Sequence, residues 1–166
     1  RSSSAASDVY KRQLLDLAVV PLTLALGNLV VYCIHRYPLH HRYPVIGKQT
    51  YDVHSKAHHQ FYTDEYVVFD EYRDFYWLFF PPRMVFLFCG IQLPLQYFIL
   101  VNFVPGNMLY LYLFTSTLYF LLYEIFHYVS HLPQGHALLR FPLFALVWRH
   151  HTRHHNLKLM HKYNFN

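Results

Sequence analysis

The stretch that decides the fold is MVFLFCGIQLPLQYFILVNFVPGNMLYLYLFTSTLYFLLYEIF, residues 84–126. It contains two apolar runs: Met84–Val104 has 16 apolar residues in 21, and Met108–Phe126 has 15 in 19. Each run is close to the roughly 20 residues that a helix needs to cross the hydrocarbon core of a bilayer. Only Pro105-Gly106-Asn107 separates the runs, and Pro-Gly is a strong turn signal. The stretch therefore predicts a tight hairpin of two transmembrane helices.

A third apolar run lies near the start of the chain, where Leu14–Ile34 has 16 apolar residues in 21. Charged residues make up only 14% of the chain, against roughly 25% in a typical soluble domain. The alternative, three buried helices of a soluble protein, is disfavoured because too little polar sequence is left to cover them. We expect an all-α integral membrane protein with about three transmembrane helices.

The hairpin also predicts the topology. If the first run crosses the membrane, residues 35–83 and the residues after Phe126 lie on the same side. Eleven of the fourteen Lys and Arg residues belong to that side, and the hairpin turn has none. The positive-inside rule makes this side cytoplasmic. The formal charge of +5 therefore fits an anionic bilayer surface, and since no groove-binding module is present we expect no nucleic-acid partner.

Several segments outside the apolar runs carry further expectations. Residues 1–13 resemble an adapter-derived or disordered leader, with a basic leader to the first span as the alternative, and residues 14–166 form the membrane domain. The chain stops at residues 164–166 without a terminal signal, so we expect it to be truncated there. Phe75–Phe80, followed by two prolines, predicts an aromatic belt at the membrane interface. Cys33 and Cys89 lie in apolar runs, which indicates neither a disulfide framework nor a thiolate metal site.

Histidine is the outstanding residue of this sequence. Of its fourteen histidines, thirteen fall within residues 35–59 and 127–155, and none lies between 60 and 126. They form four clusters, which read HRYPLH (35–40), HSKAHH (54–59), HYVSH (127–131) and HTRHH (151–155). The predicted topology brings all four clusters to the same membrane face.

The spacing within the clusters indicates metal ligation. Histidines three or four residues apart lie on one face of a helix, where two imidazoles can bind one ion or neighbouring ions. Adjacent pairs such as His58-His59 and His154-His155 point about 100° apart, so they can reach different ions. The clustered imidazoles are too many for one ion and suit two. Imidazole binds iron, zinc, copper and nickel alike, so the spacing does not name the metal.

Some neighbouring residues compete for these roles. His150 competes with His151, and His41 with His40, whereas the isolated His136 and His161 are expected to support the site or lie on the surface. Glu124 stands three residues before His127, the spacing that soluble di-iron bundles use, and we expect it to orient an imidazole rather than to bind metal. Five acidic residues near the second cluster are expected to be solvated or to support ligands: Asp52, Asp64, Glu65, Asp70 and Asp74.

From about Asp16 to its last residue, the sequence resembles the fatty-acid-hydroxylase/sterol-desaturase superfamily of membrane histidine-box di-iron oxygenases. The motifs that carry the resemblance are the first three clusters, FFPP at 79–82 and RHHTRHHN at 149–156. The resemblance implies a helical membrane domain capped by a cytoplasmic, histidine-rich dinuclear centre. Its ligand positions match His35, His40, His54, His58, His59, His127, His131, His151, His154 and His155. Three residues separate His54 from His58 where some members have two, which leaves the role of His54 open.

The resemblance also implies an activity. The expected enzyme hydroxylates or desaturates a fatty acyl chain or sterol with O2 at two iron ions, with zinc possible in purified protein and no catalytic residue beyond the metal ligands. Since no Gly-rich nucleotide motif is present, electrons would come from a cytochrome b5-like or ferredoxin-like protein and its reductase. The expected location is the endoplasmic reticulum in a eukaryote or the inner membrane in a bacterium.

Three alternatives to this activity were weighed. Acyl-lipid desaturases also use histidine boxes, but three boxes with a longer gap between the first two would be expected. A metal-binding or metal-transporting membrane protein is disfavoured because the three apolar runs contain no histidine, whereas transporters bind their ions near the bilayer midplane. A catalytically inactive relative is the third alternative.

The predicted topology can be tested by labelling. A cysteine placed at Gln134 should react with a membrane-impermeant thiol reagent only from the cytoplasmic side, and one placed at Asn107 only from the opposite side. The reason is that one position follows the returning helix and the other lies in the hairpin turn. Identical labelling of the two positions would contradict the hairpin and distribute the histidine clusters over both faces.

Overall fold

The computed structural model describes residues 2–44, 47–63, 65–69, 71–160 and 162–163. These residues form helices and connecting loops, and no strand occurs among them, which confirms the prediction of an all-helical chain. The expectations for Asp64, Asp70, His161 and residues 164–166 fall outside the described residues. The chain divides into two compact units, which are described in turn.

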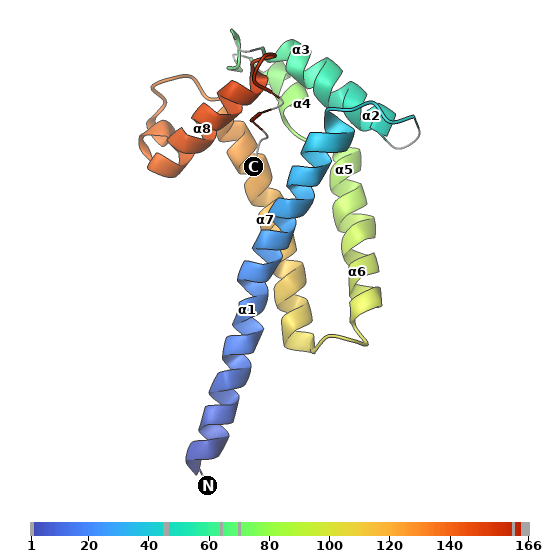
Figure 1. Ribbon diagram of the computed structural model, residues 1–166, viewed down its shortest axis with the longest axis vertical. Coiled ribbons are helices and arrows are strands. Elements are labelled where there is room, and N and C mark those ends of the chain that lie inside the picture. The colour runs from blue at the N-terminus through green and yellow to red at the C-terminus, as the bar shows by residue number, and fades with distance from the viewer. Residues whose placement is uncertain (1, 45–46, 64, 70, 161, 164–166) are drawn as a thin grey trace. The chain divides into compact units, whose positions relative to one another are not determined.

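Unit one comprises residues 1–28 and 82–121. It contains the first part of α1 (Ser2–Ile34), then α5 (Pro82–Phe86), the π-helical η4 (Leu87–Gln92), α6 (Leu93–Leu100) and the first part of α7 (Gly106–Ser130). Figure 1 shows α6 and α7 joined by a short loop into an antiparallel hairpin. Helix α1 already includes residues 2–13, so the structure continues the helix through the expected leader. The origin of these residues stays a prediction.

Three helices are long and apolar enough to cross a membrane: Tyr10–Leu39, Pro82–Leu100 and Gly106–Ser130. Their apolar side chains lie mostly on the outside, with Leu22 and Phe98 both 69% exposed and Phe114 67% exposed. Continuous apolar surface of this kind is unfavourable in water and favourable in lipid. The helices are therefore compatible with membrane insertion, as the apolar runs predicted.

The turn of the hairpin lies slightly earlier than predicted. Helix α6 ends at Leu100 rather than continuing to Val104. The Leu100 carbonyl is shared by the N–H groups of Phe103 and Val104, both at 2.9 Å, and such shared bonds are common at helix ends. Helix α7 already begins at Gly106, where the sequence had predicted a turn residue. The Pro105 carbonyl accepts the first hydrogen bond of α7, from Leu109 N–H at 3.0 Å. Proline suits a helix start because its missing N–H is not needed there.

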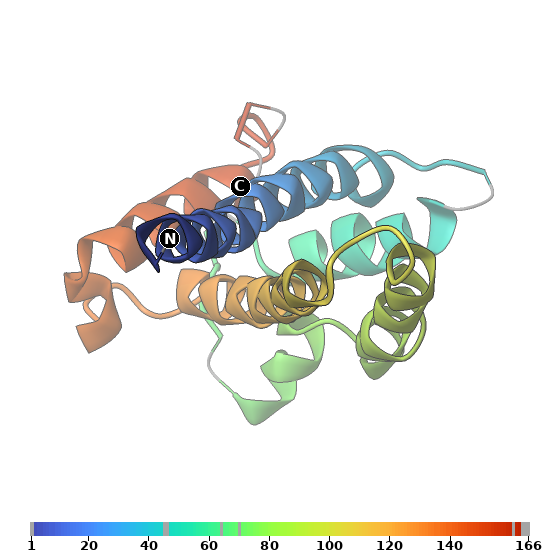
Figure 2. The ribbon, with the colours of Figure 1, turned by 90° about the horizontal axis from the view of Figure 1, so that it is seen from below.

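Within unit one, α1 lies beside α7, as Figures 1 and 2 both show. Gly27 permits this approach, since a Cβ atom there would lie 3.2 Å from the Tyr119 ring. The Tyr119 hydroxyl donates a hydrogen bond to Asn28 Oδ1 at 3.2 Å. Small residues and interhelical hydrogen bonds of this kind are common contacts between helices in lipid.

Unit two comprises residues 29–81 and 122–166 and contains all ten predicted ligand histidines. It includes the ends of α1 and α7 and a set of short helices. These are η1 (His35–Leu39), α2 (Gly47–Tyr51), η2 (Asp52–His58), α3 (His59–Phe61), η3 (Tyr72–Asp74), α4 (Phe75–Leu78), η5 (Ala137–Arg140) and α8 (Pro142–His155). Its core combines buried apolar side chains with buried histidines. The apolar ones are Leu39, Tyr62, Val67, Leu78, Val129 and Leu132.

The aromatic segment Phe75–Phe80 is half buried in unit two. The Phe79 ring stacks on Tyr128 with centroids 6.1 Å apart, and Leu78 is buried, whereas Tyr76 is 75% exposed. The segment therefore packs against the end of α7 through some of its side chains and presents others outward. Its location at a membrane interface stays a prediction.

Candidate metal centre

Two quartets of histidines in unit two have the geometry to hold metal ions. The first consists of His35, His40, His54 and His154, and the second of His58, His127, His131 and His151. In each quartet, one ring nitrogen per residue lies within 4.8 Å of the other three. Eight of the ten histidines predicted as ligands are thereby brought together from segments far apart in the sequence.

The two remaining predicted ligands adjoin the quartets. His59 Nε2 lies 3.0 Å from His154 Nε2 and 3.2 Å from His54 Nε2. His155 Nε2 lies 2.9 Å from His151 Nε2. We therefore assign the ten histidines to two groups of five. Group one is His35, His40, His54, His59 and His154, and group two is His58, His127, His131, His151 and His155.

The groups lie next to each other because adjacent histidines in the chain point into different groups. His58 belongs to group two and His59 to group one, while His154 belongs to group one and His155 to group two. This division follows from the 100° rotation per helical residue, as the sequence predicted. The His59 and His155 rings meet between the groups, with centroids 4.4 Å apart.

Two histidine pairs in group one rely on a backbone feature that the sequence-based expectations do not include. His35 and His40, like His54 and His59, are five residues apart, which corresponds to about 140° of rotation in an α-helix. The structure places the π-helical segments η1 and η2 at these positions. The wider π turn brings residues five apart onto one side, and such turns occur often at functional sites. The five-residue separation, repeated in the two histidine pairs, was the sequence signal from which these π turns could have been predicted.

Backbone carbonyls orient the imidazoles. The Nδ1 atoms of His58 and His131 lie 2.9 and 2.5 Å from the carbonyl oxygens of Trp77 and Val67. Nδ1 of His154 lies 2.6 Å from the Tyr163 carbonyl oxygen, and Nδ1 of His155 lies 2.6 Å from the Tyr62 carbonyl oxygen. A carbonyl oxygen only accepts, so Nδ1 must carry the proton. The Nε2 atoms are left with lone pairs available for a metal.

The Nε2 atoms with these lone pairs lie close to Nε2 atoms of other histidines. The Nε2 atoms of His131 and His151 are 2.9 Å apart, those of His40 and His154 3.2 Å, and those of His58 and His127 3.3 Å. Metal–nitrogen bonds of about 2.1 Å would separate neighbouring ligand nitrogens by about 3.0 Å at right angles and about 3.4 Å in a tetrahedron. A metal ion bound by both nitrogens of such a pair would therefore fit their separation. The donor set and its spacing therefore fit two transition-metal ions.

Burial keeps these imidazoles neutral. Loss of solvation lowers the pKa of His58 to about 4 and that of His154 to about 3, in the latter case with a further contribution from neighbouring His40. Burial and then the adjacent imidazoles hold the pKa of five others well below 6.5, namely His54, His59, His131, His151 and His155. Neutral imidazole is the form that binds metal.

The structure also decides between the competing histidines. His40 rather than His41 joins group one, and the exposed His41 faces the Arg36 carbonyl at 3.1 Å. His151 rather than His150 joins group two, whereas the His150 ring lies 5.5 Å from that of Tyr163. His136 accepts a hydrogen bond from Leu138 N–H at the start of η5.

The described carboxylates belong to neither group. Glu124 accepts a hydrogen bond from Phe80 N–H at 3.2 Å, so it holds the backbone before Pro81 instead of the expected imidazole contact. Asp52 pairs with Lys56 at 2.9 Å, Asp74 accepts from Glu71 N–H, and Glu65 is exposed. Among the described residues, the two groups are composed of imidazole alone.

Comparison of the chain with protein-family models, curated proteins and solved structures finds no match in any of the three. The superfamily resemblance therefore stays a hypothesis that its motifs carry.

The two groups predict the metal content. Purified protein should hold close to two transition-metal ions per chain, because ten imidazoles in two groups exceed the coordination sphere of one ion. Elemental analysis of the purified protein measures this ratio, and a value of one or none would contradict two sites. Two zinc ions would meet this prediction as well as two iron ions, since imidazole accepts both metals.

The lowered pKa values predict acid sensitivity of the metal-free protein. Below pH 6.5 the unfolded chain takes up protons that folded His58 does not accept until about pH 4, so stability should be full above pH 6.5 and fall between these values. At about 1.4 kcal/mol per pKa unit, His58 alone contributes a loss of about 3 kcal/mol. Thermal unfolding in detergent at successive pH values measures the effect. A His58→Gln variant should show a shallower dependence, and an unchanged profile in both proteins would contradict the buried neutral site.

Proposed function

We propose that this chain belongs to a membrane-bound, histidine-ligated di-iron oxygenase that hydroxylates or desaturates a lipid. The observation that carries the proposal is the pair of adjacent groups of imidazoles, most of them buried. They occur in a chain with three helices that are able to cross a membrane.

The donor set supports a transition metal. Calcium and magnesium prefer oxygen ligands, whereas imidazole suits iron, zinc, copper and nickel. The resemblance to the fatty-acid-hydroxylase/sterol-desaturase superfamily favours iron among these. Two iron ions bound by such groups would supply the activation of dioxygen that attack on an unactivated C–H bond requires.

The chain's own residues would orient the ligands and exclude water. The fully buried Tyr62 packs its ring against group two, 4.3 Å from the His131 ring and 5.2 Å from the His58 ring between centroids. Its carbonyl orients His155, and its hydroxyl donates to the Asp74 carbonyl at 3.1 Å. Leu78, Val129 and Leu132, all at most 2% exposed, belong to the same buried core of unit two, and a water-excluding core strengthens electrostatic interactions inside a site.

The surroundings support a lipid substrate and an external electron donor. The apolar helices would admit a fatty acyl chain or sterol from the bilayer. The chain has no Gly-rich nucleotide motif, so a cytochrome b5-like or ferredoxin-like protein and its reductase would supply electrons. They would approach the cytoplasmic face on which the positive-inside rule places the histidines. The membrane would be the endoplasmic reticulum in a eukaryote or the inner membrane in a bacterium.

A metal-transport function fits the geometry less well. The helices extend beyond the sequence-based runs, so His35 and His127 lie within the candidate spans rather than outside them, although close to their ends. The remaining predicted ligands lie outside the spans. Transporters bind their ions near the bilayer midplane, within broken helices, whereas these histidines gather at and beyond the helix ends.

Substitution of one histidine from each group tests the oxygenase. His58→Ala and His154→Ala should each abolish lipid oxidation while the protein remains in the membrane, because a dinuclear reaction needs both ions in place. The double variant should be no worse than either single one, as for residues that act as one catalytic unit. Mass spectrometry of lipids from cells with and without each variant measures the product.

His41→Ala is the matched control, because His41 is exposed and belongs to neither group. It should keep most of the activity. Substantial oxidation by either single variant at normal expression would remove that histidine from the site. Oxidation by both would contradict the shared dinuclear centre.

A further inference from the structure

His154 is the member of group one that comes from α8, whereas the other four come from residues 35–59. Its Nε2 atom lies 3.0 Å from His59 Nε2 and 3.2 Å from His40 Nε2. The orientation of this ring therefore decides whether α8 completes group one.

The carbonyl that orients His154 lies beyond the end of α8. Nδ1 of His154 is 2.6 Å from the Tyr163 carbonyl oxygen. Two successive turns bring the chain back to this point. The Asn156 carbonyl accepts from Leu159 N–H and Met160 N–H, at 2.9 and 2.8 Å, and the Leu159 carbonyl then accepts from Lys162 N–H and Tyr163 N–H, at 2.8 and 3.1 Å.

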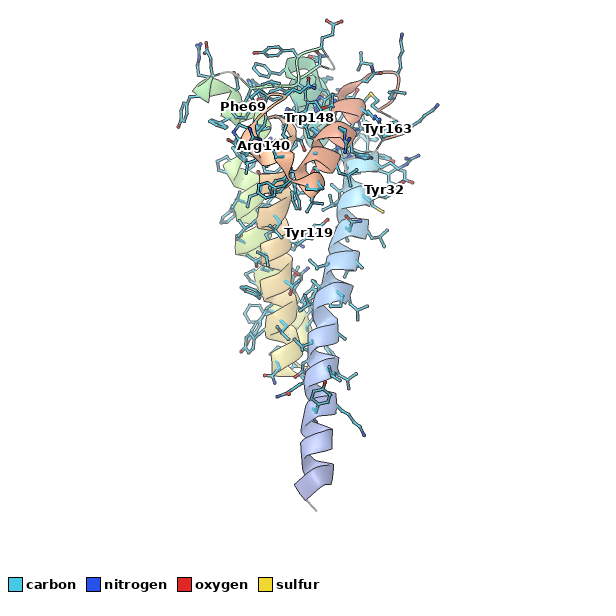
Figure 3. All side chains as sticks on the ribbon, turned by 90° about the vertical axis from the view of Figure 1, so that its left-hand side faces the viewer. Tyr32, Phe69, Tyr119, Arg140, Trp148 and Tyr163 are labelled. Carbon is cyan, nitrogen blue, oxygen red and sulfur yellow. The ribbon has the colours of Figure 1, made fainter. Side chains whose placement is uncertain are left out.

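The Tyr163 side chain, labelled in Figure 3, packs this returning segment against α8. The Arg153 guanidinium carbon lies 5.5 Å from the centroid of the Tyr163 ring, and the His150 ring lies 5.5 Å from it at 68°. His150 and Arg153 are three residues apart, which places them on one face of the helix. A guanidinium at this distance from an aromatic ring is attracted to it.

We propose that Tyr163 is a positioning residue for the group-one metal, acting through its carbonyl on His154 while its ring is held by Arg153 and His150. The inference rests on the metal-binding part of the proposed function. It also gives a role to His150, which the sequence had placed in competition with His151 as a ligand.

The effect should be selective for group one. Within group two, the carbonyls facing Nδ1 of His58, His131 and His155 belong to Trp77, Val67 and Tyr62, respectively. These three carbonyls lie in the segment between the second cluster and α5. Loss of the Tyr163 ring should therefore leave group two intact while it frees the His154 ring to rotate.

The test is a Co2+ titration of the metal-depleted full chain in detergent, followed by a graded chelator challenge and elemental analysis. Tyr163→Ala should weaken one of two binding steps by about 10- to 100-fold, the usual effect of removing a group that orients a ligand. A chelator concentration that leaves two ions in the wild-type protein should then leave one. Tyr163→Phe should retain both ions, because the contacts involve the ring and the backbone carbonyl.

Two further variants identify the affected site. His40→Ala removes a group-one ligand directly, so adding Tyr163→Ala to it should cause no further loss of the surviving ion. Tyr72→Ala is the matched control, since that tyrosine is 88% exposed, and it should bind two ions as the wild type does. If Tyr163→Ala does not fold, the double change His150→Ala with Arg153→Gln loosens the same ring from α8 and should give the same selective weakening.

The outcomes are distinct. Wild-type affinity for both ions in Tyr163→Ala, equal weakening of both steps, or loss of an ion in Tyr163→Phe would each overturn the role of Tyr163. Wild-type protein that binds a single ion would contradict the dinuclear proposal instead. In that case the role of Tyr163 is retained if Tyr163→Ala weakens binding of the single ion, and it is overturned if the affinity is unchanged.

Discussion

The convergence of neutral nitrogen lone pairs in a buried space is the constraint on which the rest of unit two depends. Burial lowers the pKa of His54 and of His151, and neighbouring imidazoles lower it further, so both rings are neutral. A neutral ring presents either a proton or a lone pair at each nitrogen, and backbone carbonyls fix which for four of the rings, namely His58, His131, His154 and His155. With Nδ1 facing a carbonyl, several Nε2 atoms point at other Nε2 atoms about 3 Å away. That arrangement favours a bound cation, and helix ends, short helices and loops must hold it in register.

The features that local sequence encodes could be predicted. The apolar runs and the hairpin are visible in composition and turn chemistry, and the structure places candidate spanning helices at all three runs. The division of His58-His59 and His154-His155 between the groups follows from helical rotation alone. The gathering of the clusters in one unit could be predicted because a hairpin crosses twice and returns the chain to the same side. This inference requires no knowledge of any tertiary contact.

What could not be predicted depends on contacts between residues distant in sequence. The carbonyls of Val67 and Tyr62 serve His131 and His155, and no residue type at positions 67 and 62 signals this, because every residue carries a carbonyl. Glu124 had the spacing of a metal-site carboxylate, yet its carboxylate accepts a hydrogen bond from the backbone N–H of Phe80. The end of α6 was misplaced because residues 101–104 are as apolar as the helix before them, so composition gives no signal for the point at which Phe103 and Val104 come to share the Leu100 carbonyl.

The π-helical η2 changes how spacer length should be interpreted in sequences of this kind. Three residues lie between His54 and His58, where some members of the superfamily that this sequence resembles have two. An extra residue would rotate every following side chain by about 100° in a regular α-helix. A π turn absorbs one residue locally and lets the helix continue on either side. In this chain His54 and His59 meet across that turn, with Nε2 atoms 3.2 Å apart. A search pattern with rigid gaps would discard such a chain, whereas one that tolerates a single inserted residue before the paired histidines would retain it.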